Sequence, residues 1–222
     1  LAEQNRCKIF VEGESDKIVL QRCMKIFFPS EEKRVDIETK PRGGGHNYVM
    51  DMLMGWRAQH KHHPSKPKAA GIVDWDAVPE KKKWNETPGN VSSAKCFCYP
   101  KPPHAVTALK AGFRLIVTLE VLYSAEIWQW AQENDFLEAR PLMDVLPHQT
   151  VESILNEKTS VKDAIDESFA IYVTHRFNAE SKISAARYVA SLDARRLRRE
   201  FLPIQTMLKN ILTYFEITMP DS

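Results

Sequence analysis

The chain has 222 residues, of which 43% are hydrophobic and 27% charged, and its formal net charge at pH 7 is +2. These values are ordinary for a globular protein with a core that forms without covalent cross-links. A net charge so close to zero excludes a uniformly basic nucleic-acid-binding protein, so any basic surface must be local. No run of about 18 apolar residues occurs, which argues against a transmembrane helix.

The N-terminus lacks the charged and then apolar segments of a secretory signal, so we expect a cytoplasmic protein without a membrane partner. The sequence begins with Leu rather than Met, and a piece of a longer protein is therefore an alternative. Cys7, Cys23, Cys96 and Cys98 contain no C-x-x-C pair. This spacing favours buried reduced thiols over a zinc site.

The first hundred residues alternate between short apolar runs and amphipathic helical patterns. We expect strands at residues 8–11, 35–39, 69–74 and 94–99, and helices at 15–28, with Ser15 as the N-cap, and at 46–60. Strands separated by helices form parallel sheets with right-handed crossovers. The ends of the first and third strands can then lie side by side.

The pattern changes after residue 76. Residues 78–93 indicate a long loop with at most one short helix, residues 113–119 a strand or the start of a helix, and residues 121–134 a helix. From residue 151 onward only helical periods occur. The sequence therefore predicts an α/β protein, with a Rossmann-like, mainly parallel sheet flanked by helices over residues 6–125 and a helical C-terminal subdomain over residues 126–222.

Four acids follow the first and third expected strands. Glu12 ends the first strand and Asp16 lies one helical turn later, while Asp74 and Asp76 end the third and point to the same side if the segment is extended. Carboxylates gathered at one edge require cations between them, and oxygen ligands favour Mg²⁺ or Mn²⁺. The alternative is that the aspartates are turn residues and the other acids only favour a helix N-terminus.

The segment Phe10-Val-Glu-Gly-Glu-Ser-Asp16, with Asp74-Trp-Asp76, resembles the TOPRIM domain of topoisomerases, bacterial primases, recombination mediators and OLD-family nucleases. The resemblance covers roughly residues 6–125 and is closest to the TOPRIM nucleases of bacterial anti-phage defence. It implies a TOPRIM-type sheet in which Glu12 is a metal ligand or general acid/base, Asp74 and Asp76 bind metal, and Asp16 assists. No motif places a tyrosine nucleophile, a zinc module or a phosphate loop, which leaves metal-dependent phosphodiester hydrolysis as the expected activity.

Weaker features accompany these motifs. Lys81 is a candidate to neutralise charge at the scissile phosphate, as the OLD-like resemblance implies, although a lysine run is commonly only solvated. Glu120 lies in an apolar stretch, and it either approaches the metals or pairs with an arginine, because an unpaired buried carboxylate is costly. Gly43, Gly44 and Gly45 form either a plain turn or a loop that lets phosphate approach backbone amides.

Nucleic acid is the expected partner of this site, through Arg42, Lys82, Lys83, Arg195, Arg196, Arg198 and Arg199. The last four belong to a basic stretch that a partner protein or plain solvent could equally face. We therefore expect a Mg²⁺- or Mn²⁺-dependent endonuclease acting on DNA or RNA in anti-phage defence. The resemblance implies control by a separate ATPase, and self-association stays open. The alternatives are a non-catalytic TOPRIM-like binding or assembly module, or a fragment of a larger topoisomerase- or primase-like enzyme.

Overall fold

The computed structural model describes residues 6–41, 43–62, 67–156 and 165–217. The strands are β1 (Cys7–Val11), β2 (Val35–Glu38), β3 (Ala69–Val73), β4 (Ala94–Cys98), β5 (Leu137–Ala139) and β6 (His175–Phe177). The α-helices are α1 (Glu14–Phe27), α2 (Gly45–His60), α3 (Val78–Glu86), α4 (Pro103–Lys110), α5 (Ala125–Glu133), α6 (Leu142–Val145), α7 (His148–Leu155), α9 (Ala170–Thr174), α10 (Lys182–Ser191), α11 (Ala194–Glu200) and α12 (Leu202–Tyr214). Short 3₁₀ helices are η2 (Glu32–Arg34), η3 (Trp75–Ala77) and η4 (Leu119–Leu122).

The chain divides into two compact units, Leu1–Pro100 with Ala186–Ser222, and Lys101–Ala185. The sequence-based boundary between residues 125 and 126 therefore falls inside the second unit. Helices α11 and α12 belong to the unit that contains the four-stranded sheet, instead of forming part of a separate C-terminal region.

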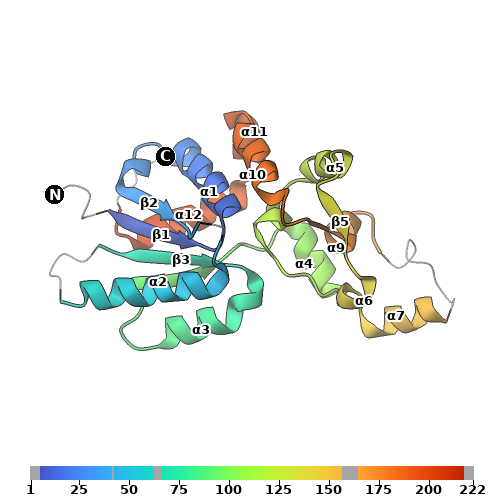
Figure 1. Ribbon diagram of the computed structural model, residues 1–222, viewed down its shortest axis with the longest axis horizontal. Coiled ribbons are helices and arrows are strands. Elements are labelled where there is room, and N and C mark those ends of the chain that lie inside the picture. Colours follow the sequence, from blue (N-terminus) through green and yellow to red (C-terminus); the bar gives the residue numbers. More distant parts are fainter. Residues whose placement is uncertain (1–5, 42, 63–66, 157–164, 218–222) are drawn as a thin grey trace. The chain divides into compact units, whose positions relative to one another are not determined.

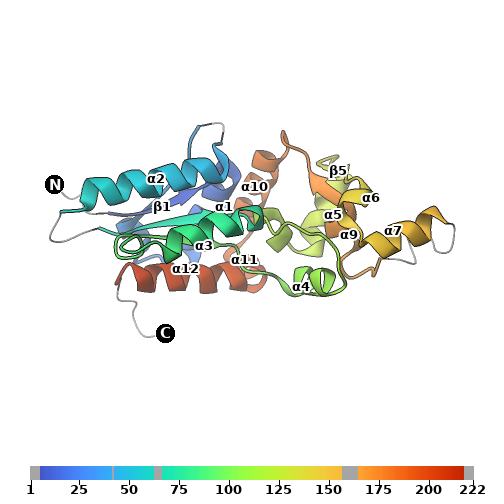
Figure 2. The ribbon, with the colours of Figure 1, turned by 90° about the horizontal axis from the view of Figure 1, so that it is seen from below.

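The first unit is built on a four-stranded parallel sheet with the strand order β2-β1-β3-β4. Helices α2 and α12 lie on opposite faces of this sheet (Figure 2), and α1 packs beside α12 (Figure 1). The expected α/β class, with a parallel sheet flanked by helices, is confirmed. Because β1 and β3 are neighbours, the segments that follow them emerge side by side at the carboxyl edge of the sheet.

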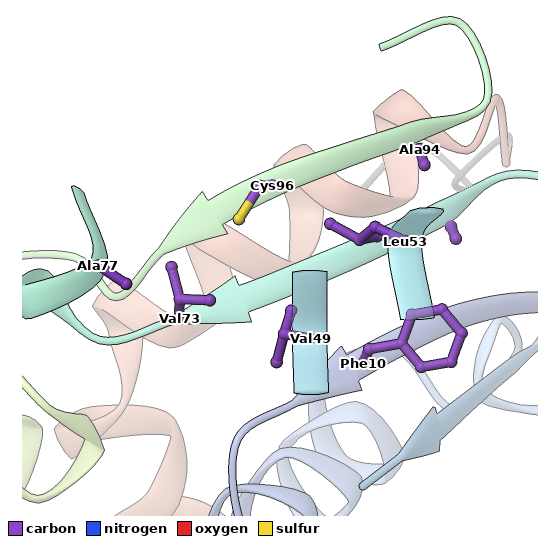
Figure 3. Close-up of a cluster of buried hydrophobic side chains, with 8 residues drawn as sticks. Phe10, Val49, Leu53, Val73, Ala77, Ala94 and Cys96 are labelled. Carbon is purple, nitrogen blue, oxygen red and sulfur yellow. The ribbon is translucent and has the colours of Figure 1, made fainter. Parts of the chain in front are cut away.

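The core beneath α2 is closely packed. Val49 and Leu53, both fully buried, point from α2 toward Phe10 of β1 and Val73 of β3 (Figure 3). Gly71 of β3 lies directly below them. A Cβ atom added there would lie 2.6 Å from Cγ1 of Val49 and 2.9 Å from Cδ1 of Leu53. This glycine is therefore required by the close approach of the helix to the strand.

The free edge of β4 is covered by α3. Asn85 donates from Nδ2 to the Cys96 carbonyl at 2.8 Å and accepts the Cys96 N–H at 3.0 Å, as a neighbouring strand would. Trp84 donates from its indole nitrogen to the Ala94 carbonyl at 3.1 Å. These side chains satisfy backbone groups that an edge strand otherwise leaves open. The segment expected to be largely a loop is thus a nine-residue helix with a defined structural role.

The second unit combines helices with an antiparallel pair, β5 and β6. Its core is aromatic, because the fully buried Trp128 packs edge-on against Tyr172 and Phe177. His104 stacks on Tyr172 at 3.8 Å and contacts the Val121 carbonyl through Nε2 at 2.8 Å. Burial lowers the pKa of this histidine, which favours its neutral form.

Three sequence predictions differ from the structure. Residues 113–118 alternate between buried and more exposed side chains but belong to neither a strand nor a helix, and the next regular element is η4. The region after residue 151 contains strand β6 in addition to helices. Helix α1 begins at Glu14 with Gly13 as its N-cap, so Ser15 lies inside the helix. No helix among the described residues is both long and apolar enough to cross a membrane.

Buried thiols should make this protein less stable in alkali. Burial raises the pKa of both Cys23 and Cys96 to about 12, whereas the unfolded chain ionises its thiols near 9.0. Unfolding therefore releases protons above pH 9.0, and the free energy of unfolding should fall by about 1.4 kcal/mol per pH unit for each thiol. The loss continues until the folded thiols ionise, near pH 12. Urea unfolding at a series of alkaline pH values measures this slope.

The matched variants are Cys23→Ala and Cys96→Ala. Each should reduce the slope by one thiol's share, whatever its effect on stability at neutral pH. Tyr214, whose pKa burial also raises, adds a further fall only above its ordinary value of 10.0. If the slope were unchanged in both variants, the fall in stability would not come from the raised pKa values of these two thiols.

Candidate functional site

Glu12 and Asp74 meet at the carboxyl edge of the sheet. Glu12 follows β1 and Asp74 follows β3, so the pairing of these two parallel strands brings them together. The Asp74 backbone N–H donates to Oε1 of Glu12 at 2.8 Å. Both side chains are half-buried. The contact fixes one oxygen of Glu12 against the neighbouring strand end.

A glycine loop lies against Glu12. The Gly44 N–H donates to the Glu12 carbonyl at 3.1 Å, and a Cβ atom on Gly45 would lie 3.9 Å from Oε2 of Glu12. Gly43 and Gly45 have φ values of 77° and 57°, which favour glycine. A Cβ on Gly44 would stand 2.5 Å from that of Tyr48. The three glycines therefore let the start of α2 approach Glu12 closely.

Asp16 is held by an aromatic side chain from the end of β4. The Tyr99 hydroxyl donates to Oδ1 of Asp16 at 2.5 Å, and both side chains are buried. The Tyr99 carbonyl accepts from the indole nitrogen of Trp75 at 2.7 Å, which ties the β4 end to the Asp74–Asp76 segment. A Cβ at Gly13 would lie 3.0 Å from Oδ2 of Asp16. Tyr99 was not predicted as a site residue, although its position directly after the fourth strand places it at this edge.

Asp76 is not arranged as expected. The segment after β3 is not extended, because Asp76 lies within the 3₁₀ helix η3 and is exposed, whereas Asp74 precedes that helix and is half-buried. The two aspartates therefore differ in their environment, even though they are only two residues apart.

Lys81 and Cys98 lie within electrostatic range of the carboxylates. Burial is the main cause of the raised pKa of the Cys98 thiol; Lys81 opposes it, and the charges of Asp74, Glu12 and Asp76 raise the pKa further. The Lys81 ammonium lies 6.0 Å from the centroid of the Trp75 ring. Lys81 is therefore the member of the lysine run that faces this edge. Cys98, expected only as a structural thiol, is a neighbour of the acids.

Several expected site residues lie elsewhere. Lys82 and Lys83 are exposed, with Lys82 3.9 Å from Glu86. Glu120 belongs to the second unit, where it accepts from the Thr118 hydroxyl at 2.7 Å and pairs with Lys182 at 3.2 Å. Its ion-pair partner is Lys182, and the charge of Glu120 also acts on the Arg140 guanidinium. Arg42 lies outside the described residues.

The arginine stretch is used largely for internal contacts. Arg196 and Arg199 both contact Glu200, at 2.6 and 3.2 Å. Arg198 donates to the Ile26 carbonyl at 2.6 Å and so fastens α11 to the end of α1. Arg195 is exposed. These contacts reduce the basic surface that the sequence indicated.

Within the described ranges, no three His, Cys, Asp or Glu side chains are grouped as a ready-made metal site. The structure instead brings the Glu12 carboxylate against the Asp74 backbone N–H, with Asp16 held by Tyr99 and Asp76 exposed on η3. Comparisons of the chain with protein-family models, with curated proteins and with solved structures found no match.

Proposed function

We propose that this protein is a TOPRIM-type, Mg²⁺- or Mn²⁺-dependent nuclease that hydrolyses phosphodiester bonds of DNA or RNA. The observation that carries the proposal is the contact between Glu12 and the Asp74 backbone at the ends of two adjacent parallel strands. Open α/β sheets present their chemistry at this edge. The meeting of the glutamate-glycine and Asp-x-Asp motifs at this edge supports the proposal.

The residues fit a hard divalent cation. Their donors are carboxylate oxygens, which Mg²⁺ and Mn²⁺ prefer. Mg²⁺ commonly uses one or two protein carboxylates and completes its coordination with water and substrate phosphate, so a pair of acids is sufficient. Gly13 and Gly45 leave space beside the carboxylates of Asp16 and Glu12.

In the proposed site Glu12 and Asp74 hold the cation, with Asp76 and Asp16 as further oxygen donors. A bound cation would supply an activated water and charge stabilisation at the leaving oxygen. Glu12 is oriented by the Asp74 amide, and Asp16 is oriented by the Tyr99 hydroxyl. Lys81 is the group that we assign to balance the charge of the substrate phosphate.

The proposal includes a nucleic-acid substrate, a role in anti-phage defence and control by a separate ATPase. These parts rest on the resemblance to OLD-like nucleases. Arg42, Lys82, Lys83 and Arg195 are the basic residues that we assign to the nucleic acid, since the other three arginines make internal contacts.

Manganese binding separates the metal site from the activity. We expect Asp74→Asn to weaken Mn²⁺ affinity at least about tenfold, measured by electron paramagnetic resonance without substrate. The same variant should lose manganese-dependent cleavage of plasmid DNA and transfer RNA. Asp51→Asn, an exposed change on α2, is the matched control and should leave both unchanged. Equal Mn²⁺ binding by the unaltered protein and both variants would reject the metal site and favour a non-catalytic binding or assembly module.

A further inference from the structure

One edge of the four-stranded sheet is open. β2 is the terminal strand, and in the described part of the chain it pairs with β1 alone. The opposite edge, β4, is covered by the Asn85 and Trp84 side chains. An uncovered edge strand presents backbone N–H and C=O groups that can pair with another extended chain.

A cavity of 630 Å³ lies beside this edge, and all four residues of β2 and one side of α1 line it. Its size is typical of ligand-binding clefts. Its lining is predominantly polar and includes Lys17, Arg22 and Lys25 from α1. The Nε of Arg22 is buried and makes no hydrogen bond with any described residue. The cavity therefore lies beside the backbone groups of the open β2 edge and also beside side-chain hydrogen-bond donors of α1.

The charges of the cavity favour an acidic occupant. Asp36 and Glu38 on β2 are already neutralised, because Lys8 contacts both, at 2.8 and 2.5 Å, and Arg6 contacts Asp36 at 2.8 Å. Lys17 and Lys25 form no ion pair with any described residue. The α1 wall thus carries positive charge that the floor of the cavity does not balance.

The spacing of these lysines matches an extended peptide. Lys17 and Lys25 are eight positions apart on α1, which is about 12 Å along a helix axis. Two residues four positions apart on one face of a strand are about 13 Å apart. A strand added beside β2 can therefore direct acids toward both lysines.

We propose that the open edge of β2 and its cavity form a docking site for an acidic extended segment of another protein, which pairs with β2 as a fifth strand. The open backbone gives affinity, and the lysines of α1 select acidic side chains. Nucleic acid is less favoured, because a phosphodiester backbone has no amide N–H and C=O groups that could pair with the open edge of β2. The proposal does not depend on nuclease activity.

The test uses a fluorescein-labelled peptide of alternating glutamate and valine, about eight residues long. We expect saturable binding to the full chain by fluorescence anisotropy. The double variant Lys17→Glu/Lys25→Glu should weaken binding at least about tenfold, and should instead bind the corresponding lysine–valine peptide. This gain also shows that the variant is folded. Two further peptides carry N-methyl groups on alternate residues, either on the glutamates or on the valines. One of the two should lose binding and the other should keep it, because only one set of amides faces β2.

Three outcomes would overturn the proposal. The first is absence of binding by the glutamate–valine peptide to the unaltered protein. The second is binding that is insensitive to both the charge reversal and N-methylation. The third is that the charge reversal has no effect on peptide binding. It would instead remove the binding of a single-stranded oligonucleotide, or dissociate a dimer seen by light scattering. That result would assign the cavity to nucleic acid or to a second copy of this chain.

Discussion

Glu12→Gln should reduce the rate of metal-dependent phosphodiester cleavage by about 10²–10³-fold with little loss of stability. Glutamine keeps an oxygen that can accept the Asp74 N–H, so the contact that joins the ends of β1 and β3 survives. It removes the negative charge needed to hold a cation or to accept a proton. Single-turnover cleavage in Mn²⁺, with urea unfolding of the same preparation, measures both quantities.

The control for this variant lies two residues away. Glu14 is the first residue of α1 and, unlike Glu12, does not directly follow a strand. Glu14→Gln should therefore retain cleavage within a factor of about three, since it changes only a helix N-terminal charge. If both variants lost activity equally, the effect would come from the overall charge of this edge, and the specific role of Glu12 would be excluded.

Gly71→Ala should lower the free energy of unfolding by about 1–3 kcal/mol. The new methyl group would lie 2.6 Å from Cγ1 of Val49, and Val49 is fully buried, so the helix or the strand must shift. Val49→Ala alone should cost about 2 kcal/mol by leaving a cavity. The double variant should be more stable than the sum predicts by about 1 kcal/mol, because each change accommodates the other.

Gly55→Ala is the matched glycine control. No atom lies within 4 Å of a Cβ added at Gly55 in α2, so alanine should stabilise the protein by up to about 1 kcal/mol through its helix propensity. Chemical denaturation of these four variants, beside the unaltered protein, measures the free energies of unfolding. A strictly additive double variant would show that Val49 and Gly71 are not coupled through packing.

The parallel sheet and the adjacency of Glu12 and Asp74 could be predicted because both depend on local patterns. Each strand is a short apolar run, and the intervening amphipathic helices require parallel crossovers. The two acid motifs then follow strands that the topology makes neighbours. The sequence could not indicate how far the acids converge, because that depends on the 3₁₀ turn that contains Asp76 and on the Tyr99 hydroxyl that holds Asp16.

The second unit was harder to predict for a different reason. Phe113, Leu115 and Val117 are buried and alternate with more exposed residues, so the period of a strand is present. The segment nevertheless has no partner strand among the described residues, and the Arg114 N–H bonds to the Val145 carbonyl instead. Periodicity reports which side chains are buried, but a strand also needs a neighbouring backbone, and that neighbour is a property of the tertiary fold.

The covering of β4 by Asn85 limits how this protein can assemble. A β-sheet that grows indefinitely from copy to copy needs two open edge strands on every copy, because each copy must pair with a neighbour at both of its edges. In the described sheet only β2 is open, so edge-to-edge pairing between copies ends with a closed pair. Two side chains of α3, Asn85 and Trp84, thereby separate a sheet that can accept one guest strand from one that could polymerise into fibres.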